Sequence, residues 1–129
     1  EALLTLLKEP GPPAPAGPPP IAVARVRDVL HAQPSRRPSV VALAAQAGLH
    51  PVYLTRRFRQ SYQTSISGYA RRLRSRLAAE RLAAGDPGIQ VAHDLGFADQ
   101  SHMIRIFVAE FGITPGRYQR LIRVASERS

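Results

Sequence analysis

Arginine supplies almost all of the positive charge in this chain of 129 residues. Of its 18 basic residues 17 are Arg, against 9 carboxylates, which leaves a formal net charge of +9. A guanidinium presents a planar set of N–H donors that fits phosphate oxygens, or the O6 and N7 edge of guanine, better than a lysine ammonium does. The chemistry that these residues indicate is the binding of a polyanion, either a nucleic acid or an acidic membrane surface.

Residues that could perform catalysis or hold a metal ion are sparse. Cys is absent, which excludes disulfides, thiolate nucleophiles and cysteine zinc sites. Ser101 and His102 are neighbours, but adjacent positions on a helix point apart and do not form a nucleophile and base pair. Glu80 and Asp94 are isolated carboxylates that suit a partner Arg better than acid catalysis. None of the four His residues has the i,i+4 partner typical of a helical zinc site: His31, His50, His93 and His102. We expect no enzyme, no metal and no cofactor.

The arginines are concentrated in the middle of the chain. Between Arg56 and Arg81 there are eight Arg against Glu80 alone, a net charge of +7 in 26 residues. A run of charge is often only a solvated helix face. Here acidic partners at i±4 are nearly missing, so the guanidinium groups mostly repel one another, and we favour a face that binds a polyanion.

Helices must position these side chains, because no stretch shows a sustained period of two. Apolar residues at helical spacing, with Pro and Gly between them, predict helices over 21–32, 40–47, 51–61, 66–84, 89–95, 100–111 and from Pro115 onward. The expected N-caps are Ser39, Ser65, Asp99 and Thr114. The expected glycine terminators are Gly48, Gly85 and Gly112. The fold class is therefore all-α, with seven helices.

The first 20 residues differ from the rest of the chain. Residues 1–9 carry four Leu, and we interpret them as the end of a preceding domain, or alternatively as a frayed tail. Residues 10–20 hold seven of the 12 prolines, which indicates a semi-rigid linker rather than helix or strand. A proline-rich ligand for a recognition module is the alternative interpretation. The globular domain is expected to begin near Ile21.

One supersecondary unit occurs twice in the chain. At an offset of 48, Ala44, Gly48 and Leu49 match Ala92, Gly96 and Phe97. At an offset of 49, five positions match in the helix that follows and beyond it: Leu54, Arg56, Phe58, Tyr62 and Tyr69 correspond to Met103, Arg105, Phe107, Phe111 and Tyr118. Each copy reads as a helix, a short turn containing Gly and a second helix, which is the spacing of a helix-turn-helix. In such a unit the second helix presents its outer face to the DNA major groove.

The long helix expected between the two copies has a length that suits this interpretation. About 20 residues span ~30 Å. Successive major grooves on one side of DNA lie about 34 Å apart. A stiff helix of this length could therefore hold two reading helices one turn of DNA apart.

The stretch 96–120, GFADQSHMIRIFVAEFGITPGRYQR, resembles the signature of the AraC/XylS family of bacterial transcription regulators. The matching positions are Gly96, Phe97, Ser101, Arg105, Phe107, Gly112, Thr114, Pro115 and Tyr118. The resemblance implies a seven-helix domain over 21–122, with two helix-turn-helix subdomains joined by a long linker helix, and a tail over 123–129. It also implies that residues 1–9 end an effector-binding or dimerisation domain.

The resemblance further implies which side chains read bases: Val52, Thr55, Arg56, Ser101, His102 and Arg105. Their chemistry fits, because Arg can bond guanine in bidentate fashion and Val can meet a thymine methyl group. The chain departs from the family pattern at Gln63, where Gly is frequent. It departs again after Phe107, where Lys is frequent and Val108 and Ala109 stand instead. The second helix-turn-helix therefore has only Arg105 on its reading helix, and its hold on phosphates is expected to be weak.

We expect a transcription regulator that binds a double-stranded DNA operator of roughly 17–20 base pairs through two adjacent major grooves. The expected phosphate contacts are Arg57, Arg59, Arg71, Arg72, Arg74 and Arg76. RNA polymerase is the expected partner of an activator, an effector would bind the preceding domain, and the expected location is the bacterial cytoplasm and nucleoid, without a membrane partner. The alternatives are a non-specific architectural protein that binds DNA or RNA, and a membrane-surface module that uses the Arg-rich helix.

Overall fold

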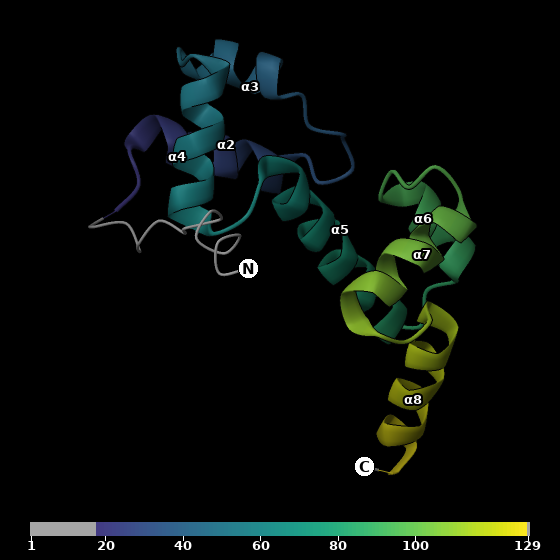
Figure 1. Ribbon diagram of the computed structural model, residues 1–129. Coiled ribbons are helices and arrows are strands. Elements are labelled where there is room, and N and C mark those ends of the chain that lie inside the picture. The colour runs from purple at the N-terminus through teal and green to yellow at the C-terminus, as the bar shows by residue number, and fades with distance from the viewer. Residues whose placement is uncertain (1–17, 129) are drawn as a thin grey trace, which may run out of the picture. The chain divides into compact units, whose positions relative to one another are not determined.

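The computed structural model describes residues 18–128, and over these residues the chain forms seven α-helices and no strand (Figure 1). The prediction of an all-α fold is confirmed. The helices are α2 (Ile21–Ala32), α3 (Val40–Ala47), α4 (Pro51–Tyr62), α5 (Ile66–Ala83), α6 (Gly88–Asp94), α7 (Gln100–Phe111) and α8 (Pro115–Arg128).

The predicted helix ends agree with the structure to within one residue up to the end of α7. The last helix does not: α8 continues to Arg128, so residues 123–128, which we expected to form a tail, are helical. The hypothesis on residues 1–9, and most of that on residues 10–20, concern residues outside the described part of the chain.

The helices belong to two compact units. The first unit contains the described residues up to Leu30 together with Pro38–Gly68, and the second contains His31–Arg37 together with the residues from Tyr69 onward. The first unit therefore holds α3 and α4, and the second holds α6, α7 and α8. The segment His31–Arg37 is part of the second unit. Its first two residues end α2 and the others form the loop after that helix, and the whole segment is called the loop His31–Arg37 below.

Side-chain caps begin five of the helices, because the first backbone N–H groups of a helix have no partner within it. The predicted caps are confirmed, with acceptor distances of 2.7–3.2 Å: Ala42 donates to Ser39, Gly68 to Ser65, His102 to Asp99 and Arg117 to Thr114. The fifth is an imidazole, since the Val52 N–H donates to Nδ1 of His50 at 3.1 Å. The caps of α4 and α7 define where the two predicted reading helices start.

The end of α4 differs from the other tight helix ends. Gly48 and Gly112 end α3 and α7 with φ values of 72° and 80°, in the left-handed region. Gln63 ends α4 with a φ of 61° although it carries a side chain. Its Nε2 donates to the carbonyl oxygen of Gln60 at 2.8 Å. The departure at Gln63 thus leaves the type of helix end unchanged but places a non-glycine residue where glycine is favoured.

Each unit buries its own apolar residues. In the first unit these are Val23, Val26, Leu30, Leu43, Ala44, Leu54, Phe58 and Ile66. In the second they form one cluster of Ala78, Leu82, Val91, Ala92, Leu95, Phe97, Met103 and Phe107. Burial of this apolar area supplies the main force that holds each helix-turn-helix together.

The two cores repeat the match seen in the sequence. Leu54 and its counterpart Met103 are both fully buried, as are Phe58 and Phe107. Phe58 packs on Tyr62 and Phe107 packs on Phe111, in both cases with ring centroids 4.7 Å apart. Equivalent residues therefore form the inner faces of α4 and α7, and the outer faces of the two helices are equivalent as well.

Candidate nucleic-acid interface

The helix α4 has one buried face and one exposed face. Leu54 and Phe58 are buried, whereas Val52, Thr55 and Arg56 are exposed. Positions 52, 55 and 56 lie on one side of a helix because they follow the i, i+3, i+4 spacing. The structure thus brings together the three predicted base-reading residues of the first helix-turn-helix on the surface opposite the core.

Tyr53 joins this surface, although it is not among the base-reading or phosphate-binding residues predicted from the sequence. Its side chain is 44% exposed, next to the 53% exposed Val52. A signal was present in the sequence: Tyr53 is offset by one position from Leu54 and Phe58, so it does not share their helical face. An exposed phenol at the start of a reading helix can donate to a phosphate oxygen.

The two predicted phosphate contacts on α4 have different surroundings. Arg59 is exposed, and the described residues offer it no ion-pair partner. Arg57 is partly buried, and its Nη1 donates to Oε1 of Gln60 at 2.7 Å. Its Nε is buried and finds no acceptor among the described residues. Arg59 is therefore the better placed of the two for a phosphate.

On α7, Ser101 and Arg105 are exposed one helical turn apart, on the side away from Met103 and Phe107. His102 is partly buried instead. Its Nδ1 accepts the N–H of Ala98 at 3.2 Å, and its ring meets that of Phe97 edge-on, with centroids 5.7 Å apart. Because a backbone N–H can only donate, this bond leaves the proton on Nε2, which can then donate but not accept.

The four predicted phosphate contacts on α5 divide into three groups. Arg71 and Arg76 are exposed, and no carboxylate among residues 18–128 lies within 4.0 Å of either. Arg72 lies 3.9 Å from Glu110 of α7, a long and exposed pair. Arg74 is only 7% exposed, so the expectation that it contacts DNA phosphates does not fit its position.

Arg74 has partners inside the second unit. Its Nε donates to the carbonyl oxygen of Pro34 at 3.2 Å, and its Cζ lies 5.6 Å from the centroid of the Phe97 ring. Burial lowers the pKa of this guanidinium, and the charges of Arg37 and Arg71 lower it further. The group connects the loop after α2 with the turn before α7, and a helical period alone could not show that this position faces inward.

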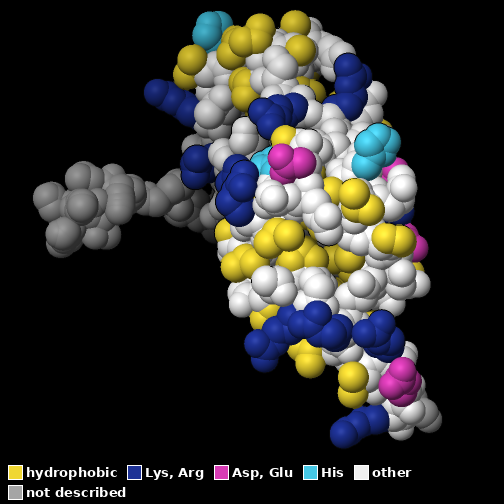
Figure 2. All heavy atoms as spheres, turned by 90° about the vertical axis from the view of Figure 1, so that its right-hand side faces the viewer, with side chains coloured by type: hydrophobic (Ala, Val, Ile, Leu, Met, Phe, Trp, Pro, Cys, Tyr) yellow, Lys and Arg dark blue, Asp and Glu magenta, His cyan; other side chains and the backbone are white. Residues whose placement is uncertain are grey.

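Other carboxylates form ion pairs with an arginine inside the second unit. Arg81 forms ion pairs with Asp86, and with Asp94 at 3.0 Å. Lys and Arg side chains, dark blue in Figure 2, are prominent on the face shown, and magenta Asp and Glu side chains are few. Among residues 18–128, several exposed guanidinium groups have no carboxylate within 4.0 Å: they include Arg37, Arg56, Arg59, Arg71, Arg76 and Arg105.

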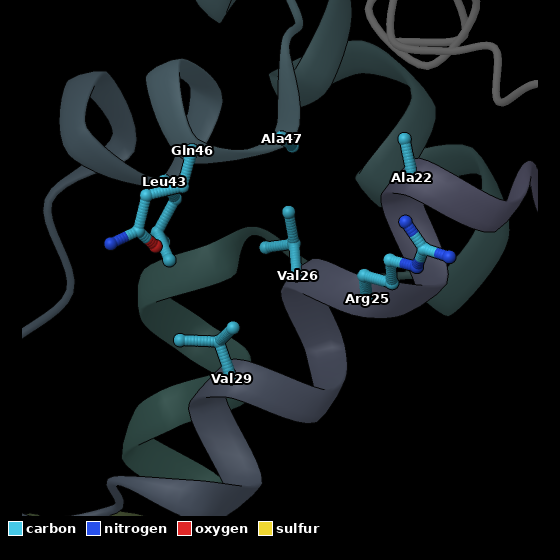
Figure 3. Close-up of a pocket in the computed structure, with 7 residues that line it drawn as sticks. All are labelled: Ala22, Arg25, Val26, Val29, Leu43, Gln46 and Ala47. Atoms are coloured by element: carbon cyan, nitrogen blue, oxygen red, sulfur yellow. The ribbon is translucent and has the colours of Figure 1, made fainter.

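The described residues contain no cluster of His, Asp and Glu that could hold a metal ion. A cavity of about 230 Å³ lies between α2 and α3 of the first unit, where Val26 and Leu43 point toward each other across it (Figure 3). Its wall is apolar apart from Arg25 and Gln46. Such a lining presents no nucleophile or acid and base pair.

No helix within residues 18–128 combines the length and the apolar character needed to cross a membrane.

The sequence pattern of a family described as a helix-turn-helix domain matches residues 43–121. The regulatory protein SoxS of Salmonella typhimurium is 33% identical over 82 residues, which cover 63% of this chain and 77% of that protein. A putative AraC-like transcription regulator of Streptomyces lividans is 30% identical over 99 residues, which cover 76% of this chain and 33% of that protein. The transcriptional activator RclR of Escherichia coli is 30% identical over 66% of this chain. The chain spans about a third of the length of these last two relatives.

Solved structures show the same fold. The C-terminal domain of AraT, a response regulator from Geobacillus stearothermophilus, matches with a TM-score of 0.74 and 25% identity, over 79% of this chain and 86% of that one. The DNA-binding domain of the transcriptional factor AdpA, in complex with a target DNA, matches with a TM-score of 0.75 and 23% identity, over 84% of this chain and 98% of that one.

Proposed function

The chain belongs to the AraC-type helix-turn-helix family, and we propose that it binds specific sequences of double-stranded DNA and thereby regulates transcription. One observation carries the proposal. Arg56 and Arg105 occupy the same position of the two repeats, each on the exposed face of its helix, opposite the buried pairs Leu54 with Phe58 and Met103 with Phe107. Neither guanidinium has a carboxylate partner within the described residues, so both are free to bond base edges.

The side chains around each arginine suit direct reading of the major groove. Arg56 and Arg105 can each bond O6 and N7 of a guanine, and Val52 can contact a thymine methyl group. Thr55 and Ser101 can bond base edges or phosphates. His102 can donate through Nε2 to a guanine acceptor or to a phosphate. We propose that α4 and α7 each enter a major groove and that the two grooves are adjacent.

Further partners follow from this proposal. RNA polymerase is the partner if the protein activates transcription. An effector would bind a domain preceding residue 21, as the greater length of two relatives suggests. The proposed location is the cytoplasm, on the nucleoid. Since the family consists of transcription regulators, no reaction is assigned to the site.

Selection of binding sites from a random DNA pool, using the 129-residue chain at about 0.15 M salt, tests the proposal. Two enriched blocks are expected. Arg56→Ala should relax the preference at one position of one block, and Arg105→Ala should relax it at one position of the other. Binding without any enriched sequence, governed by salt alone, would instead show the architectural protein that is the alternative.

A further inference from the structure

The loop His31–Arg37 is held against the second helix-turn-helix, although it precedes α3 in sequence. At its start, Nε2 of His31 lies 2.6 Å from the hydroxyl oxygen of Tyr69 on α5. In its middle, the carbonyl oxygen of Pro34 accepts the bond from Arg74. Next to it, the backbone of Ser35 approaches the turn before α7 so closely that a Cβ on Gly96 would lie 2.1 Å from the Ser35 oxygen. Loop, α5 and turn therefore form one packed assembly within the second unit.

This packing places two exposed arginines together. Arg37 ends the loop three residues after Pro34, and Arg71 precedes Arg74 by three residues, which is close to one helical turn. The charges of both act on the Arg74 guanidinium. No carboxylate among residues 18–128 lies within 4.0 Å of Arg37 or Arg71. Like charges gathered without a counter-ion repel one another, so the fold maintains this patch at a cost that an anion would offset.

The second helix-turn-helix otherwise lacks a basic side chain that could bind a phosphate near α7. Arg105 is the only Arg or Lys on α7, and Val108 and Ala109 occupy exposed positions toward its end. On α4, by contrast, Arg59 stands one turn beyond Arg56 and is free for a phosphate. Both arginines act on Arg74, which lies against Phe97 in the turn that leads into α7. If α7 lay in the groove, a DNA backbone would pass near this turn.

We propose that Arg37 and Arg71 together bind a DNA backbone phosphate next to the bases read by α7. The loop between the helices α2 and α3 thereby supplies the phosphate contact of the other helix-turn-helix. Arg74 itself is buried against Pro34 and Phe97 and does not face the phosphate. The inference rests on the proposed function, since it requires that the chain binds DNA.

A double-mutant cycle between the arginines and single neutral phosphates tests the inference. The selected DNA site is made with one methylphosphonate at a time, and its affinity for the 129-residue chain is measured for wild type, Arg37→Gln and Arg71→Gln. With wild-type protein, neutralising the relevant phosphate should weaken binding about tenfold or more. With either variant the same modification should cost clearly less, because one of the two arginines that hold the phosphate is already lost. For either variant, the magnitude of the slope of log affinity against log salt should be smaller than that of wild type by about one.

The position of the coupled phosphate decides the result. It should flank the DNA block in which Arg105→Ala relaxes the base preference. Coupling to a phosphate beside the Arg56 block, or to none, overturns the inference while leaving the proposed function intact. Failure of the wild-type chain to bind any DNA overturns the proposed function and this inference with it.

Arg25→Gln is the matched control, because Arg25 is an exposed arginine of α2 in the first unit, and no carboxylate among the described residues pairs with it. It should show no coupling to phosphates of the Arg105 block. Thermal unfolding followed by circular dichroism checks that all three variants are folded. Arg37 and Arg71 lie on different segments, so either variant alone can overturn the inference.

Discussion

Arginine side chains have three different roles in this protein. Arg105 is exposed on a reading helix and has no ion-pair partner in the described part of the chain. Arg81 is bound by two carboxylates, and Arg74 is buried against a carbonyl oxygen and an aromatic ring. The chemical capacity of the guanidinium is the same in each case. What differs is the set of acceptors that the fold brings within reach, so each role has its own experimental signature.

Replacing Arg105 by Ala should weaken binding to the preferred site by about 1–3 kcal/mol and relax the base preference at one position. The physical reason is the loss of a bidentate bond to a base edge. Fluorescence anisotropy with the preferred site and with single-base variants measures both effects. If Arg105→Ala leaves affinity and preference unchanged, α7 does not read bases.

Replacing Arg74 by Met should affect stability rather than the grip on DNA. The substitution keeps much of the volume but leaves the Pro34 oxygen without its donor, so the free energy of unfolding should fall by about 1–3 kcal/mol. The salt dependence of DNA binding should stay that of wild type while the protein is folded. Arg71→Met is the matched comparison: its unfolding free energy should change by no more than about 0.5 kcal/mol, but its salt dependence should decrease. The reverse pattern would contradict both assignments.

At the scale of single elements, the two reading helices are fixed at their first residues by hydrogen-bonding caps and along their inner faces by equivalent cores. Their ends are not equivalent. Gly112 ends α7, whereas Gln63 must adopt a positive φ at the end of α4. The helix α5 is joined to α6 by the ion pairs of Arg81 and to α8 by Gln119, whose Nε2 donates to the oxygens of Leu82 and Asp86 at 3.0 and 2.8 Å. These connections can be tested one at a time.

Gln63→Gly should raise the free energy of unfolding by roughly 0.5–1 kcal/mol, because glycine adopts the left-handed conformation without steric cost. The lost bond from Gln63 to Gln60 reduces the gain but does not reverse it. Chemical denaturation measures the change. The same substitution at the exposed helical position Gln46 should have the opposite sign, at about 0.5–1 kcal/mol destabilising. A loss of stability in Gln63→Gly would show that the side chain contributes more than the backbone strain costs.

The carboxylate of Asp94 should make stability depend on pH. Hydrogen bonds from Gln90, Arg81 and His93 hold its pKa below the ordinary value of 3.8. A lowered pKa means that the folded protein favours the ionised form, so the stabilisation is present above pH 3.8 and is lost as the pH falls through the lowered pKa.

Asp94→Asn should therefore lower the melting temperature at pH 7, and the difference from wild type should shrink as the pH is lowered below the ordinary value. Asp28→Asn is the control, because Asp28 is exposed and its pair with Arg27 is long, at 3.7 Å. A difference that persists unchanged into acid would show that the ionised carboxylate is not the source.

For the molecule as a whole, the balance of charge sets how binding responds to salt. Residues 21–129 carry 17 Arg against seven carboxylates. Several of these carboxylates are already paired inside the second unit, namely Asp86, Asp94 and Glu110. The net excess therefore lies mainly in exposed guanidinium groups that have no carboxylate partner within residues 18–128.

We expect log affinity for the preferred DNA site to fall linearly with log salt, with a slope of about −3. Each neutralised phosphate contributes about −0.9, and three phosphates are assigned: one shared by Arg37 and Arg71, one to Arg59 and one to Arg76. Titrations at several salt concentrations, with a scrambled site as control, give the slope. A slope near zero would contradict the role of the arginines in holding the backbone.

The sequence by itself determined the elements and their repetition. Helical spacing of apolar residues, with Pro, Gly and capping side chains at the boundaries, predicted the ends of six helices to within one residue. The match between Leu54 with Phe58 and Met103 with Phe107 showed which faces are buried, and so which faces carry Arg56 and Arg105. These properties depend on neighbours within a few residues along the chain, which a sequence displays directly.

Only the tertiary structure decided that Arg74 is buried and that the loop His31–Arg37 belongs to the second unit. The bond from Arg74 to Pro34 joins residues 40 positions apart, and nothing in the local pattern of either segment distinguishes it from a solvated arginine. The proton position on His102 likewise depends on how the turn before α7 closes. Burial and partner choice follow from which distant segments meet, and that is determined only when the whole core packs.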